Sequence, residues 1–200
     1  MTRRSFLTLT AFVVAAAQMT FAQSLDEARK SFDSGAYQKV VDLAGNSDDP
    51  RLVFVVAQSQ QKLRKPDDAK RSYEKLAAKP DTDAWHFIGR SALDMLASNP
   101  DSALTNADQA VKLGASIAEA HFQRGLALSA KQQMADAAAA FQKASDLDPA
   151  WAYPHYYAGI AFSKVKRADL TSTHFQAFLK LAPQAPERAE VQSILRTLGK

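Results

Sequence analysis

The feature that constrains the fold of this chain most is a pattern that repeats every 34 residues. Gly125 and Gly159 are 34 residues apart, and the same spacing separates Phe141 from Phe175. A fixed period of this length is typical of solenoids, in which pairs of helices stack along one axis and bury a continuous core between them. Three further pairs have the spacing: Pro66 and Pro100, His121 and His155, and Pro149 and Pro183.

The composition agrees with a helical, globular chain. Hydrophobic residues make up 46% of the 200 residues, and the 7 glycines and 8 prolines are too few for a β-rich or disordered protein. The absence of cysteine excludes disulfides, thiolate zinc sites and a cysteine nucleophile.

Residues 1–22 have the pattern of a bacterial export signal. A basic start at Arg3 and Arg4 precedes an apolar run over residues 6–17, and Thr20 and Ala22 suit cleavage after residue 22. Residues 2–7 also resemble the twin-arginine export motif, so the export route stays open. The alternatives are cleavage after Ala17 and an uncleaved anchor helix, for which the apolar run is short. We expect a periplasmic or secreted bacterial protein with no stable membrane span after cleavage.

Removal of this segment takes away two arginines and no acidic residue. The remaining chain carries 23 Lys+Arg against 21 Asp+Glu, a formal net charge of +2, without a dense basic run. Nucleic-acid binding depends on neutralising many phosphates, so we expect no nucleic-acid partner.

Four frames of 34 residues, starting at Pro50, Ala84, Ala118 and Ala152, show what repeats. A small residue at position eight lets two antiparallel helices approach closely, and an aromatic residue at position twenty-four can fill the space beside it. The small residues are Ala57, Ser91, Gly125 and Gly159, and the aromatic ones are Tyr73, Phe141 and Phe175, with Ala107 in the second frame. In the last two frames a proline at position thirty-two can end the second helix.

This pattern resembles the tetratricopeptide repeat. The resemblance implies an all-α, right-handed superhelical solenoid of antiparallel helix pairs, here called the A helix and the B helix of each repeat. The frame 118–151 fits best, 152–185 follows closely, 84–117 is degenerate and 50–83 lacks the final proline. We expect a shortened repeat over 23–49 and a capping helix over 186–200, where Val191, Ile194, Leu195 and Leu198 form one apolar stripe. Phe141 is predicted to pack between its own A helix and the next one.

The sequence has no enzyme motif that we recognise. It lacks a glycine-rich phosphate loop, Gly-x-Ser-x-Gly and His-Glu-x-x-His. His121 and His155 occupy the same position in adjacent repeats and could ligate a metal with Glu119, but filling a packing position is the simpler role for them. The acidic pairs Asp48–Asp49 and Asp146–Asp148 are expected to cap helices. We therefore predict no catalysis, no metal and no cofactor.

Protein binding is the chemistry that the resemblance implies. In the family, A-helix positions two, five and nine line a concave groove. The matching residues here are mostly apolar and aromatic, which favours an apolar peptide or a partner helix over an acidic tail. The predicted groove residues are Phe54, Gln58, Trp85, Ile88, Phe122, Leu126, Tyr153, Tyr156 and Ile160.

Two alternatives remain for this stripe: it could be core shared between helices, or it could be covered by a terminal segment. We predict a non-enzymatic scaffold or adaptor in the bacterial cell envelope. Self-association into a homo-oligomer, or an accessory role in cytochrome maturation, pilus assembly or secretion, is the alternative function.

Overall fold

The computed structural model describes residues 24–198, and this part of the chain is helical throughout, with no strand. The predicted all-α solenoid of antiparallel helix pairs is confirmed. Residues 24–33 form the N-terminal helix, and the later helices are α2 (Tyr37–Ala44), α3 (Pro50–Lys62), α4 (Pro66–Ala77), α5 (Ala84–Leu96), α6 (Pro100–Leu113), α7 (Ala118–Ala130), α8 (Met134–Leu147), α9 (Ala152–Lys164), α10 (Ala168–Leu181) and α11 (Arg188–Leu198).

The turn between the A and B helix has the same backbone form in every full repeat. The second residue after each A helix has a positive φ of 57–62° although none of the four is glycine. The next amide donates to a carbonyl five residues back, as Lys65 does to Gln60, which is the Schellman way to satisfy a helix C-terminus. The four residues again lie 34 apart: Arg64, Ser98, Gln132 and Lys166.

Small residues at position eight face the aromatic residues of the B helix. A Cβ atom added to Gly125 would lie 2.5 Å from the ring of Phe141, and one added to Gly159 would lie 2.5 Å from the ring of Phe175. Phe141 is fully buried between Phe122 of α7 and Tyr157 of α9, with ring centroids 5.6 and 5.3 Å away. The predicted placement of Phe141 between successive A helices is confirmed.

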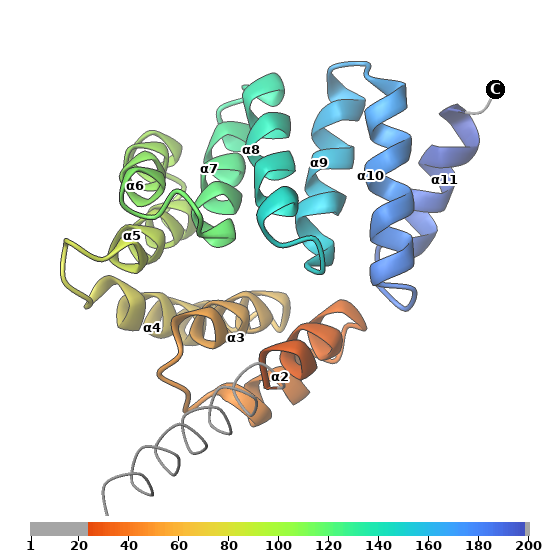
Figure 1. The fold of residues 1–200 in the computed structure, drawn as a ribbon. Coiled ribbons are helices and arrows are strands. Elements are labelled where there is room, and N and C mark those ends of the chain that lie inside the picture. Colours follow the sequence, from red (N-terminus) through yellow and green to blue (C-terminus); the bar gives the residue numbers. More distant parts are fainter. Residues whose placement is uncertain (1–23, 199–200) are drawn as a thin grey trace, which may run out of the picture.

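The chain curls strongly (Figure 1). Helices α5 to α11 follow an arc, and the N-terminal helix with α2 and α3 lies across the open side of that arc, near α8 and α9. Side-chain contacts hold this arrangement, because Arg29 reaches Asp148 and Phe32 packs on Tyr153. The first unit of the solenoid therefore meets the boundary between the last two repeats, far away in the sequence.

The C-terminal helix α11 packs on α10 and buries Val191, with Ile194 and Leu195 against the core. This is the arrangement expected of a capping helix. The predicted export signal over residues 1–22 lies outside the described residues. Within residues 24–198, no helix has the length and apolar character needed to cross a membrane.

Candidate partner-binding groove

Aromatic side chains from two A helices and from the residue before a third meet on the inner side of the solenoid. Phe54 of α3 contacts Phe122 of α7 and Trp151, the residue before α9, with ring centroids 6.4 and 6.3 Å away. Phe122 and Trp151 lie closer still, at 4.7 Å. All three side chains are buried. The strong curvature of the solenoid therefore brings side chains of the first and third full repeats into contact on the inner side.

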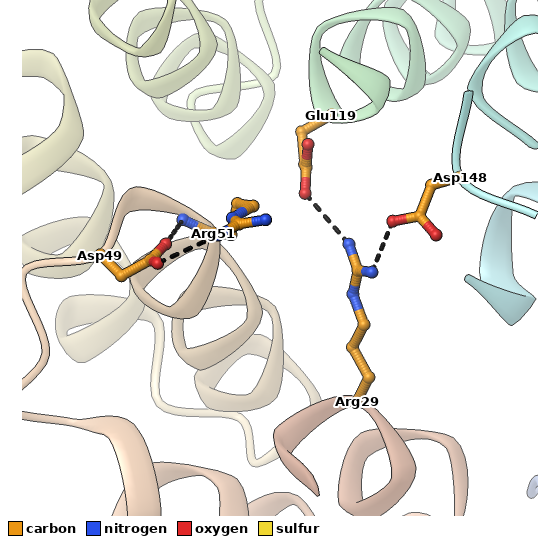
Figure 2. Close-up of polar contacts among 5 residues, drawn as sticks. All are labelled: Arg29, Asp49, Arg51, Glu119 and Asp148. Carbon is orange, nitrogen blue, oxygen red and sulfur yellow. Dashed lines mark hydrogen bonds and ion pairs between the residues drawn. The ribbon is translucent and has the colours of Figure 1, made fainter. Parts of the chain in front are cut away.

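One arginine of the N-terminal helix reaches Glu119 of α7 and Asp148 at the end of α8 (Figure 2). Arg29 Nη1 donates to Asp148 Oδ2 at 2.5 Å, and Nη2 donates to Glu119 Oε1 at 3.2 Å. Its guanidinium carbon lies 5.2 Å from the ring centroid of Trp151, a cation–π distance. We call Glu119, Asp148 and Trp151 the arginine clamp. Arg29 is 90 residues away from Glu119 and 119 residues away from Asp148 in the sequence.

Because Glu119 is buried, loss of the Arg29 guanidinium would leave its carboxylate without a cation in the protein interior. The Glu119 side chain is only 5% exposed, and burial raises the pKa of this carboxyl against the opposing charge of Arg29. Asp49 caps α3 by accepting from the Arg51 amide at 2.8 Å, as predicted. Asp148, which was also expected to cap a helix, instead accepts from the Arg29 guanidinium. A cleft of about 380 Å³ opens beside the clamp; its lining includes Arg51, Trp85, Glu119 and Asp148.

A second hollow, the groove cavity, has a volume of about 400 Å³, and Phe122 forms part of its wall. Apolar side chains of α5, α7 and α9 and three glutamines line it. Gln123 is buried, and its Oε1 has no hydrogen-bond partner among residues 24–198. A buried acceptor without a partner costs free energy that a donating ligand would recover. Lining residues include Phe32, Gln58, Gln61, Lys62, Met95, Phe122, Gln123, Leu126, Tyr153 and Tyr157.

Polar contacts tie the wall of the groove cavity to the C-terminal segment. Glu187 accepts from Lys62 Nζ and from the Tyr153 hydroxyl, both at 2.9 Å. Burial works to raise the pKa of Glu187, but the hydrogen bonds from Lys62 and Tyr153 and the charge of Lys62 together outweigh it and hold the pKa below its usual range. Asp33 lies in the same region, and burial raises the pKa of its carboxyl to about 7, although the charge of Arg29 opposes the shift.

The histidines pair differently from the arrangement considered in the sequence. His155 Nδ1 lies 3.1 Å from Nδ1 of His174, whereas His121 Nε2 contacts the carbonyl of Ala115. Burial, together with the charge of His155, lowers the pKa of His174 to about 4, so His174 is neutral near pH 7. In the part of the chain that the structure describes, no group of three or more His, Asp or Glu side chains could hold a metal ion.

Comparison with known proteins agrees with this geometry. Residues 118–151 match the family model of the tetratricopeptide repeat. A protein of Thermus thermophilus, TTC0263, described as a thermophilic tetratricopeptide repeat protein, is 18% identical and superposes with a TM-score of 0.61 over 88% of this chain and 97% of its own. The chain has the fold of a tetratricopeptide repeat protein.

Two further solved structures have this fold at low identity. The TPR2AB domain of yeast Sti1, in complex with pHSP90, is 13% identical, with a TM-score of 0.54 over 88% of this chain and 84% of its own. MamA is 18% identical, with a TM-score of 0.50 over 73% and 84%. No curated protein matches the sequence.

The tetratricopeptide repeat positions predicted to line the groove differ in exposure. Buried are Phe54, Trp85, Ile88, Phe122 and Tyr153; half-buried are Gln58, Leu126, Tyr156 and Ile160. Four of the nine line the groove cavity: Gln58, Phe122, Leu126 and Tyr153. Tyr156 instead bonds to Glu190 of α11 at 3.3 Å, and Ile160 packs against the core.

Sequence reasoning missed Arg29, Asp148 and Trp151 as parts of the inner surface. The available signal was Glu119, an acidic residue at an A-helix position that faces the groove in tetratricopeptide repeats. A buried carboxylate needs a cation, but the sequence could not show that the cation comes from the N-terminal helix.

Proposed function

We propose that this chain is a non-enzymatic scaffold that binds a peptide or a partner helix in the groove cavity. The observation that carries the proposal is the cavity itself, because apolar walls surround a small number of polar groups that can fix the orientation of a ligand. Gln58 and Gln123 offer amide groups of the kind that pair with a peptide backbone, and the acceptor of Gln123 is unused within residues 24–198.

The fold supports this proposal, since the domain of yeast Sti1 with the same fold was solved in complex with pHSP90. The groove cavity here is lined mainly by apolar and amide side chains, with Lys62 as a cation that Glu187 already pairs. This lining favours an apolar segment with free backbone groups over a strongly acidic one.

Site-specific photo-crosslinking tests the proposal. A photoreactive phenylalanine analogue at Leu126, inside the groove cavity, is expected to capture a partner segment, whereas the same analogue at Lys143, exposed on α8, is not. A synthetic peptide of the captured segment should compete with crosslinking at Leu126. It should bind the unmodified chain, and Leu126→Arg should abolish that binding by placing a charge in the apolar wall.

Equal capture at both positions, or peptide binding that survives Leu126→Arg, would contradict the groove assignment. Leu126 is preferred to Phe122 for this test, because Phe122 is fully buried and its truncation would damage the core.

The location that we propose for this scaffold is the bacterial cell envelope. The support is the basic start and apolar run over residues 1–22, followed by small residues that suit cleavage. Fractionation of a bacterium that expresses the full chain should recover it outside the cytoplasm, with a mass that matches a chain starting at residue 23. Recovery of the intact chain from the cytoplasm would overturn this part of the proposal.

A further inference from the structure

We propose that the arginine clamp recognises a partner helix that carries an arginine and, three residues later, an aromatic side chain, and that the N-terminal helix occupies this site in the free protein. This inference rests on the proposed function, because it names the chemistry of the partner and the element that the partner displaces.

The N-terminal helix serves as a template for that partner. Residues three apart lie on one face of a helix, so Arg29 and Phe32 meet the solenoid together. Arg29 binds the clamp, while Phe32 packs edge-on against Tyr153 at a centroid distance of 4.9 Å and forms part of the groove cavity wall. A planar cation between two carboxylates and an indole ring is a demand that arginine meets and lysine does not.

The resident helix fits this site incompletely. Arg29 Nε is buried and has no hydrogen-bond partner among residues 24–198, although the other two guanidinium nitrogens are paired. Burial of Asp33, one residue after Phe32, disfavours docking of the helix while this acid is ionised, and the negative charge of Glu187 adds to the effect. A partner helix without an acid at the position of Asp33, and with a hydrogen-bond acceptor for the Nε of its arginine, would bind the same site more tightly.

The site also has room for a different occupant. The cleft of about 380 Å³ beside the clamp shares Glu119 and Asp148 with it, so a side chain of an incoming partner has space next to the carboxylates that Arg29 uses. The N-terminal helix is short, and an isolated helix of this length is only marginally stable in water. Its position depends on docking and can be lost without unfolding the repeats that form the clamp.

Peptide binding to the full chain tests the inference. The probe is a fluorescent peptide with the sequence of residues 24–36, in which asparagine replaces the aspartate that corresponds to Asp33. It is titrated into the unmodified chain and into the variant Arg29→Ala, Phe32→Ala, which empties the clamp. We expect at least about tenfold tighter binding to the emptied chain, because occupancy of the clamp reduces the apparent affinity by the fraction of open molecules.

Matched variants identify the contacts. A peptide with lysine in place of the arginine, and one with leucine in place of the phenylalanine, should each bind the emptied chain at least about tenfold more weakly. Adding Glu119→Gln and Asp148→Asn to the emptied chain should abolish binding of the original peptide. Unchanged binding after these substitutions, or no binding to a folded emptied chain, would overturn the proposal.

Hydrogen exchange in the unmodified chain covers the case in which the emptied chain fails to fold. Amides of residues 28–33 should exchange faster than those of α8 and α9, and excess peptide should accelerate them further without changing α8 and α9. Equal protection of both regions, unaffected by peptide, would refute displacement. A concentration-dependent dimer that Arg29→Ala abolishes would assign the clamp to a second copy of this chain and overturn the separate partner.

The two proposals can fail separately. Capture at Leu126 that persists when the clamp is mutated would support the proposed scaffold function and contradict only the proposal of an arginine-bearing partner helix. Peptide binding at the clamp without any capture at Leu126 would support the clamp as a binding site and contradict the groove cavity as the site where the scaffold binds its partner.

Discussion

The close contact between Gly125 and Phe141 leads to a prediction in which two opposing effects can be weighed. Alanine is the better helix former, so Gly125→Ala within α7 would stabilise an unobstructed helix by about 0.8–1 kcal/mol. The new Cβ, however, would lie 2.5, 2.6 and 2.9 Å from three atoms of the Phe141 ring, where ordinary carbon contacts are roughly 3.5–4 Å. The ring or the helix must therefore move by about 1 Å.

The ring has little freedom to move. Phe141 is fully buried, and Tyr157 stacks on it at an interplanar angle of 26° while Phe122 lies on another side. Overpacking of this kind costs about 1–3 kcal/mol, and the trapped ring places this site in the upper part of that range. Overpacking exceeds the helix-forming gain, so Gly125→Ala should lower the free energy of unfolding by about 1–2 kcal/mol.

Urea denaturation followed by circular dichroism measures this change, with tryptophan fluorescence as a second probe to check that the transitions coincide. The control is the same substitution in a Phe141→Leu background, where the shorter side chain leaves space and Gly125→Ala should become neutral or stabilising. Gly159 and Phe175 have the same geometry and should reproduce the result. Stabilisation by Gly125→Ala in the unmodified chain would refute the close-packing argument.

Two other predictions concern the contacts that close the solenoid. The unfolded carboxyl of Asp33 loses its proton near pH 4 and the buried one near pH 7, so the folded state binds the extra proton between these values and stability falls as the pH rises through them. Asp33→Asn should therefore raise the free energy of unfolding at pH 8 by up to about 4 kcal/mol and leave it nearly unchanged at pH 4. Urea denaturation at both pH values measures this difference. An equal effect at both pH values would contradict the raised pKa of Asp33. Glu187→Gln should cost about 1–3 kcal/mol in the same assay, because Lys62 and Tyr153 both donate to this carboxylate, and a loss no larger than that of the exposed control Glu74→Gln would argue against the contact.

The repeat architecture could be predicted from the sequence, because the packing inside a repeat is local. A small residue at position eight and an aromatic residue at position twenty-four meet within one helix pair, so their spacing is visible in a single frame. The left-handed residues after each A helix were not predictable in the same way. None of these positions is a glycine, the residue that usually indicates a positive φ: they are Arg64, Ser98, Gln132 and Lys166. The backbone adopts this form because the last carbonyl groups of each helix need hydrogen-bond donors.

The inner surface could be predicted only in part. Gln58, Phe122, Leu126 and Tyr153 line the groove cavity, as A-helix positions in this kind of repeat are expected to do. Arg29 was not predicted, because nothing in its neighbourhood distinguishes it from a solvated charge on a short helix. Its role depends on Glu119 and Asp148, which are far away in the sequence.

The sequence by itself determined the helix pairs, their period and the residues that fill each pair, since these follow from contacts repeated at a fixed short spacing. Only the tertiary structure decided how far the solenoid curves. Curvature is a sum over all repeats, and here it is enough to bring Phe54 to Trp151 and Arg29 to the arginine clamp. It therefore also decided that the chain's own N-terminal helix lies where we propose that a partner binds.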